Sequence, residues 1–78
     1  MLGESNFNKI SIGDLVSWTD LGRSRRKRRG LVLQKWVSTD LMSSDERKIA
    51  MLKVVDSFDN KIVNIYAINA KIESKSTT

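Results

Sequence analysis

The sequence predicts a small all-β protein: one antiparallel barrel of four to five strands, with a long basic loop between the first two strands. Its apolar residues fall in short blocks rich in Val, Ile, Trp and Tyr, which suit a pleated, half-buried surface. Seventy-eight residues allow one domain but are too few for a seven-stranded sandwich. Closing so short a sheet on itself would remove its exposed edges, which favours a barrel.

Five apolar blocks are the candidate strands. They are residues 14–18, 31–37, 49–55, 62–66 and a short closing piece at 70–72. Alternation within the second block places Leu31, Leu33 and Val37 on one face, with Lys35 breaking the pattern. We expect the core to be formed by Val16, Leu31, Leu33, Leu52, Val54 and Ile65.

The third block allows two interpretations. Both of its faces are largely apolar, as in a central strand covered on two sides or in a short helix. The charged residues 45–48 before it are compatible with the first turn of such a helix. Val54 and Val55 favour the strand, because β-branched side chains pack well on a pleated surface.

The connections between the blocks define the predicted organisation. Asp59-Asn60 is a good turn pair, so a hairpin should join the third and fourth blocks. Residues 38–48 read as a polar loop in which Leu41-Met42 could return to the core. The chain then divides into an N-terminal segment (1–9), the barrel (10–73) and a polar tail (74–78).

Several short motifs carry a resemblance to known barrels. They are residues 12–18 (IGDLVSW), 30–33 (GLVL), 53–56 (KVVD) and the closing stretch 64–73. These stretches resemble small SH3-like barrel proteins, including the KOW-type and the short bacterial and phage-encoded barrels. The resemblance covers residues 10–73 and implies the fold. Members of the group bind RNA, contact DNA or build virions, so the resemblance does not choose a function.

The strongest functional signal is a run of six cations within seven residues. They are Arg23, Arg25, Arg26, Lys27, Arg28 and Arg29. The chain has a net charge of +5, yet without this run eight cations would face nine carboxylates. Like charges this close repel one another, so an acidic partner outside the chain is the simplest reason for the run. Arginine binds phosphate in a bidentate manner and stacks on bases, which favours nucleic acid, RNA or DNA, bound with low sequence specificity.

Two other interpretations of the run stay open. It could dock an acidic protein surface, as in a protein-interaction or assembly module such as a phage or viral structural or host-interaction component. It could also be a solvated loop, or pair with the acidic loop 40–46 of the same or another chain. In the free protein we expect residues 20–29 to be a mobile loop, because six like charges and two flanking glycines leave the backbone little to pack against.

The aromatic residues offer a second element of a binding surface. Trp36 lies on the face opposite Leu31 and Leu33, so it would be exposed near the basic loop and could stack on a base. A core position for Trp36 is the equal alternative. Trp18 is expected to fill the core, whereas Tyr66 could fill the core or belong to the binding surface.

The composition excludes several chemistries. The chain has no cysteine and no histidine, which removes disulfides, thiol nucleophiles, cysteine- or histidine-ligated zinc sites and the commonest general base. Its carboxylates are scattered, so we expect neither catalysis nor a metal nor a cofactor. The start lacks an apolar stretch of signal-peptide length, and no run approaches the roughly 20 apolar residues of a membrane span. A cytoplasmic protein is expected.

Overall fold

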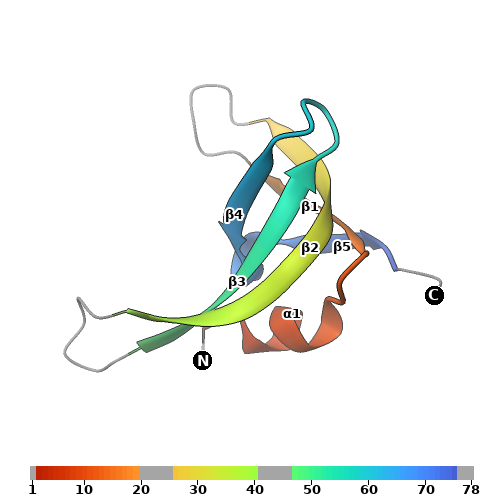
Figure 1. Cartoon of the computed structure of the whole chain (residues 1–78). Helices are drawn as coiled ribbons and strands as arrows, with labels where there is room; N and C mark the ends of the chain where they lie inside the picture. Colours follow the sequence, from red (N-terminus) through yellow and green to blue (C-terminus); the bar gives the residue numbers. More distant parts are fainter. Residues whose placement is uncertain (1, 20–25, 41–46, 76–78) are drawn as a thin grey trace.

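The structure, a computed structural model, describes residues 2–19, 26–40 and 47–75. These residues form one short helix, five strands and one 3-10 turn (Figure 1). In chain order they are α1 (Glu4–Lys9), β1 (Leu15–Thr19), β2 (Lys27–Asp40), β3 (Arg47–Asp56), β4 (Ile62–Tyr66), η1 (Ala67–Asn69) and β5 (Lys71–Ser74). Within the described part of the chain, no helix has the length and apolar character needed to cross a membrane.

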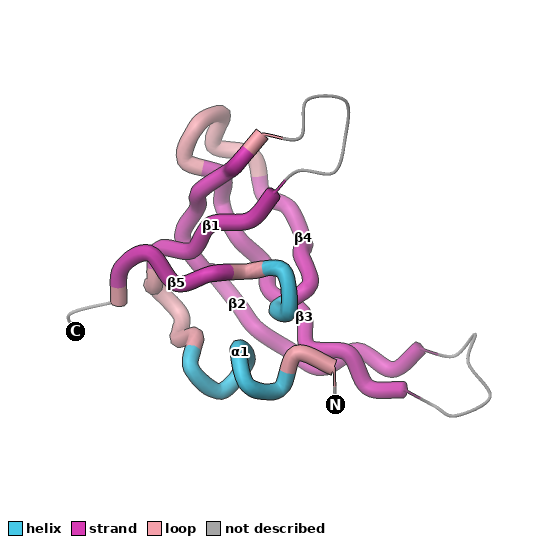
Figure 2. Tube along the Cα trace, turned by 180° about the vertical axis from the view of Figure 1, so that it is seen from behind, coloured by secondary structure: helices cyan, strands magenta, loops and turns pink. Residues whose placement is uncertain are grey.

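The strands form one curled antiparallel sheet in the order β4-β3-β2-β1-β5 (Figure 2). The all-β antiparallel fold is therefore confirmed, and the helical alternative for the third block is wrong. Closure into a barrel is not observed. Within the described residues, β4 pairs only with β3 and β5 only with β1, so the sheet keeps two edges.

Two strands are longer than the sequence indicated. β2 begins at Lys27, and Lys27, Arg28 and Arg29 pair with Thr19, Trp18 and Ser17 of β1. The basic loop predicted at residues 20–29 was therefore too long, since its last three residues are strand. At the other end of β2, residues 38–40 pair with 47–49 of β3, which shortens the predicted polar loop. Residues 20–25 and Leu41-Met42 lie outside the described residues.

The core confirms half of its predicted members. Its fully or nearly buried apolar residues are Ile10, Val16, Trp18, Val32, Ala50, Leu52, Val54, Ala67 and Ala70. Ile65 is partly buried and packs against this set. Leu31 and Leu33 were wrongly assigned to the core, because they are 46% and 42% exposed.

A β-bulge explains the error in β2. Val32 pairs with Val54 and Gln34 pairs with Lys53, so Leu33 has no counterpart on β3. A bulge of this kind moves every later residue of the strand to the other face. Val32 therefore shares the inner face with Lys35, which pairs with the buried Leu52. Strict alternation had placed them on opposite faces.

The short helix α1, which the sequence did not predict, packs against η1 and β3 at one end of the curled sheet (Figure 1). It follows Gly3, whose φ of +81° favours glycine. Asn6 Nδ2 donates hydrogen bonds to the carbonyl oxygens of Ala67 (2.9 Å), the first residue of η1, and of Ala70 (3.1 Å), just after η1. Ile10, just after the helix, is completely buried. The helix and η1 together close one end of the core.

Candidate nucleic-acid interface

The predicted basic run is divided by the fold. Arg23 and Arg25 lie outside the described residues, and Arg26 immediately precedes β2. Arg28 pairs with Trp18, whose side chain is buried in the core, so Arg28 points to the inner face. Its two neighbours in the strand, Lys27 and Arg29, therefore point to the outer face.

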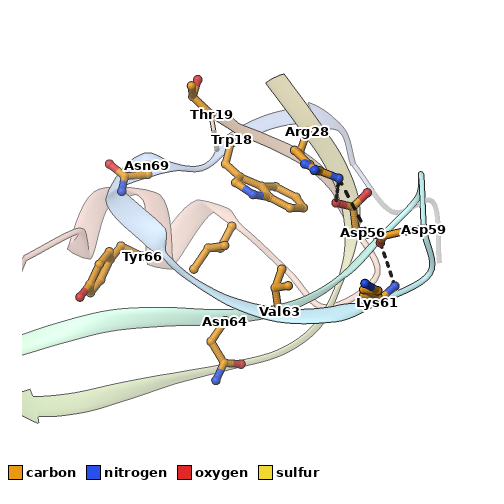
Figure 3. Close-up of a pocket in the computed structure, with 11 residues that line it drawn as sticks. Trp18, Thr19, Arg28, Asp56, Asp59, Lys61, Val63, Asn64, Tyr66 and Asn69 are labelled. Atoms are coloured by element: carbon orange, nitrogen blue, oxygen red, sulfur yellow. Dashed lines mark hydrogen bonds and ion pairs between the residues drawn. The ribbon is translucent and has the colours of Figure 1, made fainter. Parts of the chain in front are cut away.

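Arg28 is committed to the protein itself. Its Nη1 lies 3.1 Å from Asp56 Oδ2 and 3.9 Å from Asp59 Oδ2, across the turn between β3 and β4 (Figure 3). Asp56 is only 4% exposed, and its Oδ1 accepts the backbone N–H of Phe58 at 2.9 Å. Arg28 thus compensates a nearly buried carboxylate and ties this turn to the start of β2.

Lys27 is also paired, on the opposite face of the sheet. Its Nζ lies 3.0 Å from Glu73 Oε1, and Ser17 Oγ donates to the same oxygen at 2.6 Å. The Ser17 hydrogen bond, and after it Lys27, hold the pKa of Glu73 below its usual value. This group links β1, β2 and β5. More than half of the Lys27 side chain nevertheless remains exposed.

Arg26 and Arg29 differ from these two cations. Both side chains are exposed, and within the described residues neither forms an ion pair or a hydrogen bond through its guanidinium group. Two positive charges therefore face solvent at the start of β2, beside Lys27, which is ion-paired with Glu73. An exposed guanidinium keeps all five of its N–H donors available for an oxyanion.

An exposed aromatic ring stands next to these cations. Phe58, in the turn between β3 and β4, is 84% exposed, and Arg28 Cζ lies 6.0 Å from its ring centroid. The ring and the start of β2 both line a hollow of about 120 Å³. Its lining is Arg26, Lys27, Arg28, Arg29, Asp56 and Phe58. Phe58 was not among the predicted binding residues; the available signal was a large aromatic residue in the connection between the third and fourth blocks.

A larger cavity of about 370 Å³ opens beside this hollow, between β1 and β4 (Figure 3). Trp18 and Val63 line its apolar part, while Asn64 points away from it. Arg28 and Lys61 are balanced at its rim by Asp56 and Asp59. With its charges balanced, the cavity has no strong attraction for an anion. Trp18 occupies the core position predicted for it.

The other two aromatic residues lie away from the basic strand start. Trp36, Met51 and Tyr66 form one cross-strand row on the outer face. Trp36 is half-buried and lies seven residues beyond Arg29, about 20 Å along the strand. Tyr66 is 50% exposed, so the core alternative for it is wrong, because β4 turns it to the same face as Met51. The structure does not bring Trp36 together with the cations.

Comparisons with known proteins identify no relative from which a function could be transferred. No protein-family model, curated protein or solved structure matches the chain. In the described part of the chain, no three His, Cys, Asp or Glu side chains converge as metal ligands. The groups on which a function can be argued are therefore the exposed cations at the start of β2 and the ring beside them.

Proposed function

We propose that this protein is a non-enzymatic nucleic-acid-binding module that binds phosphates through the start of β2, with low sequence specificity. The observation that carries the proposal is the pair Arg26 and Arg29, two exposed guanidinium groups that form no ion pair among the described residues, although the charge of Arg29 helps to lower the pKa of Glu73. Charge-assisted bonds from arginine to phosphate are strong and often bidentate. Lys27 adds a third exposed charge on the same strand.

The fold supports the same proposal. The strands follow one another as a meander, and β5 returns after η1 to pair with β1. This arrangement is compatible with a small barrel-like fold that is not closed, and we take it as a small SH3-like barrel on the resemblance of residues 10–73. That group includes RNA-binding and DNA-contacting modules, so a nucleic-acid partner suits the architecture without being required by it.

Low sequence specificity follows from the elements available. The major groove of a duplex admits an α-helix or a two-stranded ribbon, whereas β2, which carries these cations, is a central strand paired on both sides in a five-stranded sheet. Among the described residues the only α-helix, α1, has six residues and packs against η1 and β3. Contacts from the start of β2 would therefore reach mainly the phosphate backbone, which fixes position but carries no sequence information.

The test is the salt dependence of binding to fluorescein-labelled oligonucleotides, followed by fluorescence anisotropy. Three to five phosphate contacts should give a log–log slope of about −2 to −4. The double variant Arg26→Ala/Arg29→Ala should bind more weakly and should reduce the slope by about 1.4 on single strands or about 1.8 on duplex. Its melting temperature should stay equal or rise slightly, because self-repulsion falls.

The matched control is Lys9→Ala/Lys48→Ala, which lowers the net charge equally. Both lysines are exposed and belong to α1 and to the far end of β3. The control should keep the parental slope within about 0.3, because local phosphate contacts set the slope. If both variants weaken binding equally, only net charge matters. If the parent shows no salt-sensitive binding to DNA or RNA, an acidic protein surface becomes the partner to test.

A further inference from the structure

We infer that Phe58 is a stacking platform for a nucleobase, and that the nucleic acid this protein binds is therefore single-stranded. The inference rests on the proposed function and adds the class of nucleic acid to it. Phe58 is the most exposed of the large apolar residues described, at 84%. A single exposed apolar residue is ordinary on a protein surface, so the argument depends on what surrounds it.

The turn that carries Phe58 is held by its own hydrogen bonds. Asp56 accepts the Phe58 N–H on its side chain at 2.9 Å and the Asn60 N–H on its carbonyl oxygen at 2.8 Å. Asn60 has a φ of +58°, a conformation that Asn tolerates better than most residues. Lys61 closes the turn by donating its N–H to Asp59 Oδ1 at 3.0 Å. The backbone beneath the ring is thus already ordered, so binding would cost little conformational entropy.

The same turn is fixed to the cationic strand. Ser57 donates both its N–H and its hydroxyl group to the carbonyl oxygen of Arg29, each at 2.9 Å. The residue before the ring therefore contacts the backbone of a residue whose guanidinium is exposed. A base stacked on Phe58 and a phosphate bound by Arg29 would belong to the same or adjacent nucleotides. This combination of aromatic platform and basic groove is how single strands are bound without sequence preference.

Arg28 is the cation closest to the Phe58 ring in the described contacts, and it is bound within the protein. Its guanidinium lies 6.0 Å from the ring centroid and is neutralised by Asp56 and Asp59. The cation next to the ring is thus engaged within the protein, while Arg26 and Arg29 face solvent. In a duplex, each base already stacks on its neighbours, so a ring of this kind has no base face to contact unless it unstacks a step.

The experiment compares binding of the intact protein to a fluorescein-labelled dT12 strand and to a 12-base-pair duplex. Phe58→Ala should weaken dT12 binding about 5- to 150-fold, the effect of losing one stacked base. Duplex binding should change by less than about twofold, and both salt slopes should stay at the parental value, because no phosphate contact is lost. Phe58→Trp should keep dT12 binding close to parental, because a larger ring still stacks.

The matched control is Ile12→Ala, which removes another exposed apolar side chain, 60% exposed, from the turn before β1. It should leave both affinities unchanged. If Phe58→Ala binds dT12 like the parent while Arg26→Ala/Arg29→Ala loses affinity, the stacking platform is wrong and the phosphate contacts stand. An equal loss on dT12 and duplex also overturns the platform, since the ring would not select single strands. If only Phe58→Ala reduces dT12 binding, the platform stands and the phosphate contacts of the proposed function fail.

Discussion

At the two ends of the curled sheet, particular cations and apolar residues are covered to different extents. We call the end formed by α1, Ile10 and η1 the capped end, and the end formed by residues 26–29 and 57–60 the basic end. At the capped end, Lys35 Nζ donates to the carbonyl oxygens of Phe7 and Ile10, each at 2.9 Å, and lies 4.5 Å from the Phe7 ring centroid. At the basic end, Arg26 and Arg29 point to solvent.

Apolar residues show the same contrast. Ile10 is completely buried at the capped end, whereas Phe58 is 84% exposed at the basic end. Lys35 and Ile10 thus stabilise the fold at the capped end, whereas Arg26, Arg29 and Phe58 face solvent at the basic end. The contrast holds for these residues and not for every residue of each end, since Arg28 at the basic end is ion-paired with Asp56 and Ile68 of η1 is 48% exposed. Residue type alone therefore does not decide whether a side chain stabilises the fold. What decides it is whether another element covers or pairs with that side chain.

The largest effect should come from the capped end. Ile10→Ala removes buried methyl groups from a small core and should lower the free energy of unfolding by about 2–5 kcal/mol, measured by urea denaturation. Ile12→Ala, two residues away and 60% exposed, should change it by less than about 0.5 kcal/mol. A similar cost for both variants would mean that α1 does not seal the core, and the contrast between the two ends would disappear.

A smaller effect should separate Arg28, which is ion-paired with Asp56, from Arg29, which forms no ion pair within the described part of the chain. Arg28→Ala leaves the nearly buried Asp56 without its ion pair and should lower the free energy of unfolding by about 1–2 kcal/mol, after allowance for partial exposure. Arg29→Ala should cost less than about 0.5 kcal/mol and should instead weaken oligonucleotide binding. Chemical denaturation and anisotropy on the same two proteins measure both quantities. The reverse ranking in either assay would contradict the assignment of roles.

The smallest effect should appear in acid. Ser17 and Lys27 lower the pKa of Glu73 in the folded protein below the model value of 4.5, so the ionised form is favoured by folding. This contribution to stability is present above that value and is lost as the pH falls through the lower, folded pKa. Melting temperatures of the parent should therefore drop more steeply below about pH 4.5 than those of Glu73→Gln. Parallel curves for the two proteins would show that Glu73 does not couple β1, β2 and β5 in this way.

The sequence by itself determined the strand content, the hairpin at Asp59-Asn60 and the concentration of positive charge between the first two strands. These features depend on local chemistry: β-branched and aromatic residues favour extended backbone, and Asp-Asn pairs favour turns. Val16, Leu52 and Val54 could be assigned to the core from the sequence, because inward and outward positions alternate regularly within strands that have no bulge.

Only the tertiary structure decided which residues of β2 face the core and which cations of the basic run are ion-paired within the protein. The bulge at Leu33 reverses the alternation of β2, and nothing in the residues around it announces an unpaired position. Arg28 is neutralised by Asp56, 28 residues away, and Lys27 by Glu73 at the end of β5, so the run divides according to strand pairing. The contact between Ser57 and Arg29 likewise places Phe58 beside the exposed arginines. Such partners are distant in the chain, and only the folded sheet brings their atoms within hydrogen-bond distance.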